Sequence, residues 1–106
     1  MNDKQLTDLF KALSNKTRLR MVQLLRDPEK HFPSQYYYQR EEDFPGGVCA
    51  GDIQSKLDVS QSTTSRNLSL LQKCGLLEKQ SVGKWSYYRR NEKVIKQLDC
   101  FLRKVL

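Results

Sequence analysis

The sequence predicts a domain of the mainly α class with one small β-hairpin, in the order of four helices, the hairpin and a final helix. Three observations support this prediction. Apolar residues recur with helical spacing over most of the chain. Gly75 ends the longest internal helical pattern, and two short runs with aromatic residues follow it. The 106 residues form a single small domain, 1–106, whose core is modest enough to favour a partner.

The N-terminal quarter of the chain predicts two amphipathic helices. The apolar residues of the first share one helical face at spacings i, i+3, i+4 and i+7, and they are Leu6, Leu9, Phe10 and Leu13. The second helix is expected to begin near Asn15, whose side chain can cap it. Its predicted inner stripe consists of Leu19, Val22 and Leu25. Asp27 ends it, because the residue before a proline avoids the helical conformation.

Residues 28–47 interrupt this pattern with an aromatic and acidic insert. The segment PEKHFPSQYYYQREEDFPGG contains all three prolines of the chain and two adjacent glycines. Its five aromatic residues are too many for a purely disordered loop, so parts of it are expected to fold back on the body. Residues 33–41 are compatible with a helical turn. A loop that covers exposed core is the favoured interpretation, and the alternatives are packing on the dimer, the lining of a regulatory pocket and a wider DNA-contacting surface.

A short helix, a tight turn and a longer helix are predicted after the insert. The short helix is expected over residues 49–57, and Ser60 is a good N-cap for the longer one. Gly75 supplies the left-handed conformation that ends the longer helix. Two helices joined by a turn of about three residues form a helix-turn-helix.

A basic hairpin and a last helix complete the chain. Strands are predicted over residues 76–80 and 85–90, with Val82-Gly83 at the tip. The basic residues that flank the tip are Lys79, Lys84, Arg89 and Arg90. A basic hairpin after a helix-turn-helix is a wing, on which Trp85 is interpreted as packing against the core. The last helix is expected to begin near Asn91, and its apolar stripe contains Val94, Leu98, Phe101 and Val105, widened by Ile95 and Leu102.

The charge pattern indicates a polyanionic partner. The net charge is +7, and residues 27–47 carry −3 of it, with two basic and five acidic residues. Residues 1–26 carry +4 and residues 48–106 carry +6. A basic body with a separate acidic insert is typical of proteins that bind nucleic acid.

The outer face of the longer helix predicts what that partner is. On a helical wheel Thr64, Leu68, Leu71 and Gly75 face the core. The opposite face carries Ser62, Arg66, Ser69 and Lys73, with Gln61 and Ser65 at its flank. A major groove accepts a helix and presents base edges that Gln and Arg read, mostly through the N-terminal residues of the helix. The polar face therefore predicts binding to double-stranded DNA.

Two stretches of the chain also resemble a known family. LFKALSNKTRLRMVQLL (residues 9–25) and VSQSTTSRNLSLLQKCGLLEKQSVGKWSYYRR (residues 59–90) resemble the ArsR/SmtB family of bacterial winged-helix repressors. The resemblance covers most of the chain apart from residues 28–47. It implies a homodimer built on the first and last helices, with a recognition helix over residues 61–71 in the major groove. It also implies a wing around Gly83 that meets the backbone or minor groove, and a repressor that an effector releases from its operator.

These inferences assign site residues. The residues expected to approach base edges are Gln61, Ser62, Ser65, Arg66 and Asn67. The residues expected to contact phosphates are Thr63, Lys73, Lys84, Arg89 and Arg90. The dimer interface is expected to use Leu6, Leu9, Phe10, Leu98, Phe101, Leu102 and Val105. The chain departs from the family at Asn67, where a histidine is frequent, and at Thr64, where an aliphatic residue is usual.

The cysteines indicate which kinds of effector the protein could sense. The family's arsenic and cadmium sensors carry the signature Cys-x-Cys-Asp-Leu, whereas this chain reads CAGDI, with Cys49 first and Gly51 in place of the second cysteine. One thiolate cannot hold a soft metal, because such sites need three or four N or S ligands. No metal and no cofactor are therefore expected, although a site drawing on His31, Cys49 and Cys100 stays open if the insert folds near them. Cys49 and Cys100 are also candidate sensing thiols, and inert packing is the favoured interpretation.

Other classes of protein fit less well. An enzyme is not expected, because the chain has no histidine beside a nucleophile and no glycine-rich phosphate loop. A protein-interaction module would carry more apolar anchors on the recognition helix, and an RNA-binding domain would carry aromatics on a sheet face. A nonspecific DNA-binding protein without an effector remains an alternative. The N-terminus lacks a signal sequence and the chain has no transmembrane run, so a cytoplasmic protein is expected.

Overall fold

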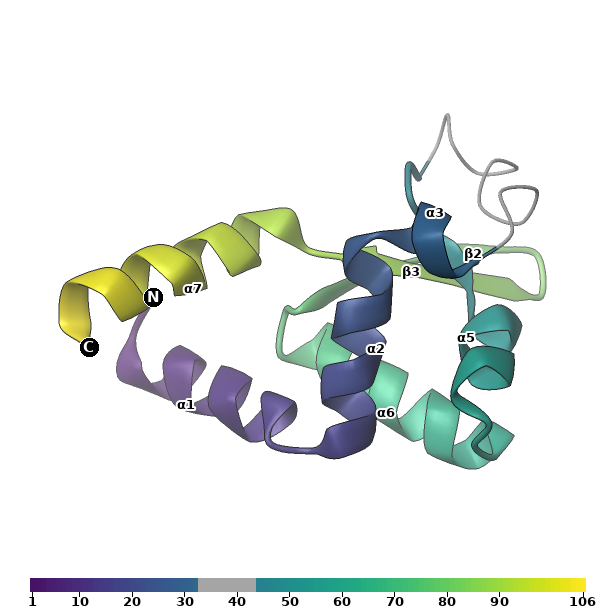
Figure 1. Ribbon diagram of the computed structural model, residues 1–106, viewed down its shortest axis with the longest axis horizontal. Helices are drawn as coiled ribbons and strands as arrows, with labels where there is room; N and C mark the ends of the chain where they lie inside the picture. Colours follow the sequence, from purple (N-terminus) through teal and green to yellow (C-terminus); the bar gives the residue numbers. More distant parts are fainter. Residues whose placement is uncertain (33–43) are drawn as a thin grey trace.

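The computed structural model describes residues 1–32 and 44–106. In chain order the elements are α1 (Asp3–Leu13), α2 (Lys16–Arg26), α3 (Pro28–His31), β1 (Val48–Cys49), α5 (Ala50–Leu57), α6 (Gln61–Lys73), β2 (Leu77–Val82), β3 (Trp85–Arg90) and α7 (Glu92–Val105). Figure 1 shows a body built on α2, α5, α6 and the sheet, with the hairpin projecting at one end and α1 and α7 extending together at the other. None of the helices among these residues is long and apolar enough to cross a membrane.

Polar side chains start the helices where the sequence predicts. The Asn15 side chain accepts a hydrogen bond from the backbone N–H of Arg18 at 3.0 Å, and the Ser60 hydroxyl accepts one from Thr63 at 3.1 Å. Asn91 caps α7 in the same way. Each bond satisfies one of the backbone donors that the first turn of a helix leaves unpaired.

Gly75 ends α6 in the left-handed conformation, with φ of +92°. A Cβ at this position would meet only Val94 Cγ2, at 3.7 Å, so space is available and the obstacle is the backbone conformation. Gly75→Ala is therefore expected to lower the free energy of unfolding by about 1–2 kcal/mol, as measured by urea denaturation. Gly51→Ala is the matched control, because Gly51 lies inside α5, where alanine is the better helix former. Equal urea midpoints for the two variants would contradict this account.

The sheet has three strands in the order β1-β3-β2, all antiparallel. The predicted sheet of two strands therefore lacks one strand that the structure contains, β1. Cys49 belongs to this strand, and the helix expected to begin at Cys49 begins at Ala50. Val48 and Cys49 pair with β3, since a hairpin alone leaves an edge of β3 without hydrogen-bond partners. Tyr87 and Tyr88 are neighbours in β3 and so point to opposite faces of the sheet, and both are buried, so both faces of β3 are covered at this point.

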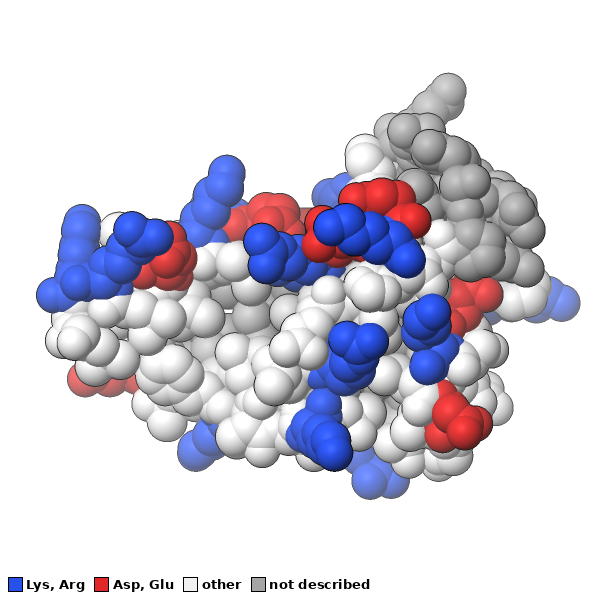
Figure 2. Space-filling view, in the orientation of Figure 1, with Lys and Arg blue, Asp and Glu red and all other residues white. Residues whose placement is uncertain are grey.

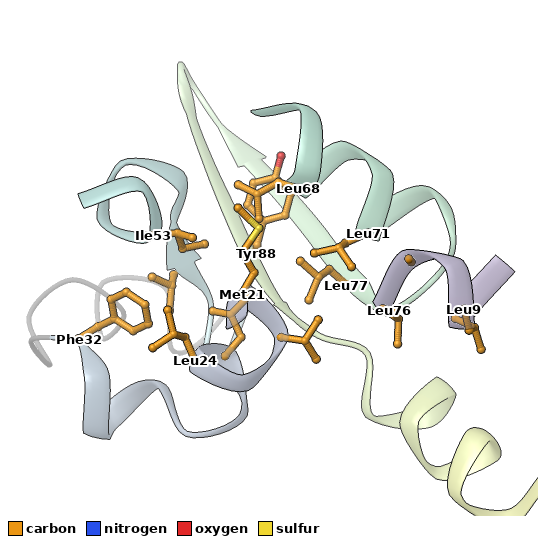
Figure 3. Packing of buried hydrophobic residues seen from close by; sticks show 14 of the residues in the cluster. Leu9, Met21, Leu24, Phe32, Ile53, Leu68, Leu71, Leu76, Leu77 and Tyr88 are labelled. Atoms are coloured by element: carbon orange, nitrogen blue, oxygen red, sulfur yellow. The ribbon is translucent and has the colours of Figure 1, made fainter. Parts of the chain in front are cut away.

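The hydrophobic core lies between the helices and the sheet (Figure 3). Its fully buried side chains include Leu9, Met21, Leu24, Ile53, Leu68, Leu71, Leu76 and Leu77. Leu19 was predicted to face inward and is exposed, because α2 turns the face with Met21, Val22, Leu24 and Leu25 toward the core.

Both described ends of the insert fold back on the body, as predicted. Phe32 and Phe44 are buried, and the Arg89 guanidinium lies over the Phe44 ring at 4.1 Å. Pro28 opens the short helix α3, which a proline in the first turn permits. The helical turn considered for residues 33–41 lies outside the described residues.

Candidate nucleic-acid interface

The N-terminal half of α6 presents a polar outer face. Gln61, Ser62, Ser65 and Arg66 are exposed on it. Among the described residues, Arg66 has no hydrogen bond or ion pair, so its guanidinium is available to a ligand. Thr64 turns inward and its hydroxyl donates to the Ser60 carbonyl at 3.0 Å. The predicted division of α6 into a polar outer face and a buried face that includes Thr64, Leu68 and Leu71 is confirmed.

The start of α6 and the wing enclose a shallow hollow of about 300 Å³. Gln61 and Ser65 line it from α6, whereas Lys84 and Trp85 line it from the hairpin. No acidic residue of the described chain lines this space. The hollow therefore joins the exposed amide, a hydroxyl and a cation into one surface, which we call the recognition hollow.

The wing tip is a two-residue turn, Gly83-Lys84, between the paired residues Val82 and Trp85. Gly83 has a φ of +58°, which tight hairpin turns require and glycine adopts at no steric cost. Trp85 was predicted to pack on the core, and the structure corrects this, because 53% of its surface is exposed. The indole projects beside Lys84, whose Nζ lies 5.9 Å from the ring centroid.

Asn67 does not belong to the outer face. It was predicted to approach base edges, but it is 8% exposed and its Oδ1 accepts a hydrogen bond from Arg18 Nη1 at 3.1 Å. The same guanidinium donates through Nε to the Ala12 carbonyl at 2.7 Å. Arg18 thus connects the C-terminal end of α1 to the middle of α6, and the Asn67 amide serves this internal bond.

Removing the Asn67 amide is expected to destabilise the fold. Asn67→Ala leaves one donor of a half-buried guanidinium without its partner, so the free energy of unfolding should fall by about 1–3 kcal/mol in urea denaturation. Ser69→Ala, on the same helix and without a hydrogen bond to a described residue, is the control. A double-mutant cycle with Arg18→Ala checks the cause: strictly additive losses would mean that the bond contributes nothing.

Arg89 and Arg90 were predicted to contact phosphates, and the structure engages both within the protein. Arg89 Nε donates to Glu78 Oε1 at 3.1 Å, and its Nη1 donates to the Pro45 carbonyl at 3.3 Å. Arg90 binds Glu92 through two bonds of 2.8 and 2.7 Å, and this bond holds the pKa of Glu92 below its ordinary value. Both arginines lie at the base of β3, away from the wing tip, where they fasten the sheet to α7 and the insert.

Lys73 and Thr63 take different positions on α6. Lys73 is exposed at the C-terminal end, about 18 Å along the helix from Gln61 at 1.5 Å per residue. Thr63 is half-buried and its hydroxyl accepts a bond from Ser60 at 2.9 Å. Lys84 and Lys73 are thus the exposed cations of the predicted phosphate set. Figure 2 shows further Lys and Arg side chains scattered over the face in view, with Asp and Glu side chains beside several of them.

The cysteines occupy three separate settings. Cys49 is half-buried in β1 and lines the recognition hollow, and Cys100 is exposed on α7. Burial raises the pKa of the Cys74 thiol, which donates to the Leu71 carbonyl at 3.3 Å and is therefore disfavoured as a thiolate. A Cβ at Gly51 would lie 3.9 Å from Cys49 Sγ, so glycine removes the neighbouring position from which a second thiol could join Cys49. Among residues 1–32 and 44–106, no three His, Cys, Asp or Glu side chains could hold a metal ion together.

The predicted dimer face divides into core and surface. Leu9 and Leu98 belong to the hydrophobic core of the single chain, so their side chains are not exposed for contact with a second copy. Leu6 and Phe101 are half-buried. The exposed apolar side chains on α1 and α7 are Phe10, Leu102 and Val105, and Val105 is 59% exposed. These two helices extend from the body at the same end of the molecule (Figure 1).

Comparison with known proteins identifies the family. Residues 46–79 match the bacterial regulatory protein, arsR family. The chain is 38% identical over 96 residues to YbzH, an uncharacterised HTH-type transcriptional regulator of Bacillus subtilis, and covers 93% of it. It is 37% identical to the arsenical resistance operon repressor of Escherichia coli, of which it spans 55%. The homodimeric winged helix-turn-helix DNA-binding domain of a Mycobacterium bovis protein has the same fold, with a TM-score of 0.64, 24% identity and coverage of 99% of this chain and 86% of that one. The chain belongs to the arsR family of bacterial regulatory proteins.

Proposed function

We propose that this protein is a homodimeric transcriptional repressor that reads operator DNA with the N-terminal half of α6 and leaves the operator when an effector signal arrives. One observation carries the proposal: Gln61, Ser65 and Lys84 converge on the recognition hollow, and no acidic residue of the described chain lines it. Ser62 and the Arg66 guanidinium, which has no partner among the described residues, extend the same face along α6.

The chemistry of this face matches a DNA duplex. Gln and Arg side chains make paired hydrogen bonds to adenine and guanine in the major groove, which is wide enough to admit a helix. The first turn of α6 also carries unpaired backbone N–H groups and the positive end of the helix dipole, which favour a phosphate. In this proposal Gln61, Ser62, Ser65 and Arg66 approach base edges, whereas Lys73, Lys84 and Thr63 support the backbone.

The homodimer follows from the apolar face of α1 and α7. Phe10, Leu102 and Val105 are exposed there, and a second copy of the chain would remove them from water. Two copies would present two α6 helices, so a two-fold symmetric operator with half-sites about one helical turn apart is expected. The homodimeric domain from Mycobacterium bovis supports this arrangement through its fold.

In this proposal an effector signal releases the repressor from its operator. Several relatives are named for arsenic or cadmium resistance. In this chain Gly51 leaves Cys49 without a second thiol beside it, so we propose an effector other than a metal held by a dithiol at this position. The protein would act in the cytoplasm, where the operator is, and without catalysis.

Fluorescence anisotropy tests the proposal. The protein is titrated with DNA from the region upstream of its own gene and with a scrambled duplex of equal length, across a salt series. Tight upstream binding with a steep salt slope is expected, because each phosphate contact releases counterions. Arsenite, zinc, peroxide and a reductant are then added to the complex to identify the signal. Equal weak binding to both duplexes would contradict a sequence-specific repressor.

A further inference from the structure

We infer that a hollow between α1 and α6 is the effector site, and that it takes a small organic acid with a carboxylate or phosphate group on an apolar body. The inference rests on the proposed function, since it assigns the place and the ligand class of the effector signal. The hollow has a volume of about 300 Å³, which small-molecule sites in proteins reach. We call it the α1–α6 hollow. Its walls include Asp8, Lys11 and Ala12 from α1, Arg18 from α2, and Leu70 and Lys73 from α6.

Arg18 joins the two walls of the α1–α6 hollow. Its Nε donates to the Ala12 carbonyl at 2.7 Å and its Nη2 donates to the Lys11 carbonyl at 3.3 Å, both at the end of α1. Its Nη1 donates to Asn67 Oδ1 on α6 at 3.1 Å. A guanidinium carries five N–H donors, so two donors of this half-buried group have no acceptor among the described residues. Unused donors at the wall of a hollow favour a ligand that supplies acceptors.

The charges around the hollow favour an anion. Lys11 and Lys73 are exposed, and neither has an ion pair with a described residue. Asp8 is the single carboxylate on the described part of the lining, and Lys4 already pairs with it at 3.1 Å. An oxyanion here would face three cations, and its bond to the guanidinium would be charge-assisted. Leu70, which is 38% exposed, offers apolar surface to the rest of the ligand.

The position of the hollow connects such a ligand to DNA binding. Figure 1 shows α1, part of the proposed dimer face, extending away from the body that holds the proposed reading helix α6. The bond between Arg18 and Asn67 therefore ties the dimer helix to the reading helix. A charged oxyanion competes with the neutral Asn67 amide for this guanidinium, because charge-assisted bonds are the stronger ones.

The competition gives the ligand its effect on the operator. When the guanidinium turns to the ligand, α6 loses this tie to α1. The two α6 helices of a dimer are then held less firmly at the spacing that two half-sites require. The ligand binds this loosened state more tightly than the state that fits the operator, so it lowers operator affinity.

NMR spectroscopy of the isotope-labelled full chain tests ligand binding without DNA. The probes are benzoate and phenyl phosphate, which share an apolar ring and differ in the anionic group, and benzamide is their neutral counterpart. At least one of the two anions at millimolar concentration should shift the backbone amide signals of Ala12, Arg18 and Asn67 in a saturable way. Benzamide should not.

Two variants with the same change of charge locate the site. Lys11→Gln removes one cation of the lining and no internal side-chain bond, so it should fold normally and weaken anion binding by about fivefold, or about 1 kcal/mol. Lys16→Gln is the matched control, because Lys16 is equally exposed and does not line the α1–α6 hollow. It should bind the anion as the wild type does.

Anisotropy with the upstream duplex tests the effect on DNA binding. At constant ionic strength, the anion that binds in the NMR titration should raise the operator Kd of the wild type and of Lys16→Gln by about fivefold or more. The same anion concentration should change the operator Kd of Lys11→Gln much less. Competition of the anion with DNA for the α6 surface would affect all three proteins equally, which would overturn the inference.

The remaining outcomes separate the inference from the proposed function. Absence of saturable shifts with both anions, or equal anion affinity of the wild type and Lys11→Gln, overturns the inference and leaves the proposed function standing. Anion binding in the hollow with unchanged operator affinity overturns the effector role in the same way. Equal weak binding of the anion-free protein to the upstream and the scrambled duplex overturns the proposed function itself.

Discussion

Arg66→Ala is expected to weaken binding to the operator by about 1–3 kcal/mol, which is roughly 5- to 150-fold. The guanidinium is exposed on the outer face of α6 and has no partner among the described residues, so its removal disturbs no internal bond. A bidentate contact to a guanine would vanish with the side chain, and affinity for random DNA would fall much less. Anisotropy with the specific and the scrambled duplex measures both losses.

Two controls separate base reading from charge. Arg66→Lys keeps the charge and loses the planar pair of donors, so it should remain weak on the operator and normal on random DNA. Lys73→Ala removes an exposed cation at the far end of the same helix and should lower both affinities equally. If Arg66→Ala weakens specific and random binding by the same factor, Arg66 is a phosphate contact.

Replacing Leu102 and Val105 by lysine is expected to convert the proposed dimer into monomers that bind the operator weakly. Both side chains are exposed on α7, so two charges there oppose burial against a second copy without entering the core of the chain. Light scattering should report 12.5 kDa in place of twice that mass. Operator affinity should fall on the order of 100-fold or more, because two linked half-site contacts become independent ones.

The same test at Leu98 would be uninformative, since Leu98 lies in the hydrophobic core and a charge there would unfold the protein. Gln97→Lys is the suitable control, because it adds a cation at an exposed polar position of α7. It should remain dimeric and bind DNA normally. A doubly substituted protein that keeps the wild-type mass in light scattering would refute the α7 interface.

Local rules of helix formation were enough to predict much of this fold from the sequence. Asn15, Ser60 and Asn91 begin their helices and Gly75 ends α6, because capping and left-handed turns depend on a few neighbouring residues. The inward face of α6 followed from the spacing of Thr64, Leu68 and Leu71 for the same reason. These features needed no knowledge of distant contacts.

The candidate site was predictable only in part. Helical periodicity put Gln61, Ser62, Ser65 and Arg66 outside, and the structure places them there. The wheel could not show that Arg18, 49 residues away in the chain, binds Asn67 and turns that amide inward. The sequence does show that Arg18 needs hydrogen-bond acceptors. Which acceptors it finds depends on how α1 and α2 pack on α6.

Tertiary structure alone decided the roles of the hairpin residues and of the apolar stripes. A basic residue in a strand is free for a phosphate or engaged within the protein according to its neighbours in the fold, and Arg89 is bonded to Glu78 across the hairpin and to the Pro45 carbonyl. Packing likewise assigns Leu9 and Leu98 to the core and leaves Val105 in water. The sequence by itself determined the helices, their caps and the chemistry of the α6 surface, because these depend on residues a few positions apart. Long-range contacts decide which polar and apolar side chains stay exposed for a partner. These contacts form only in the folded chain.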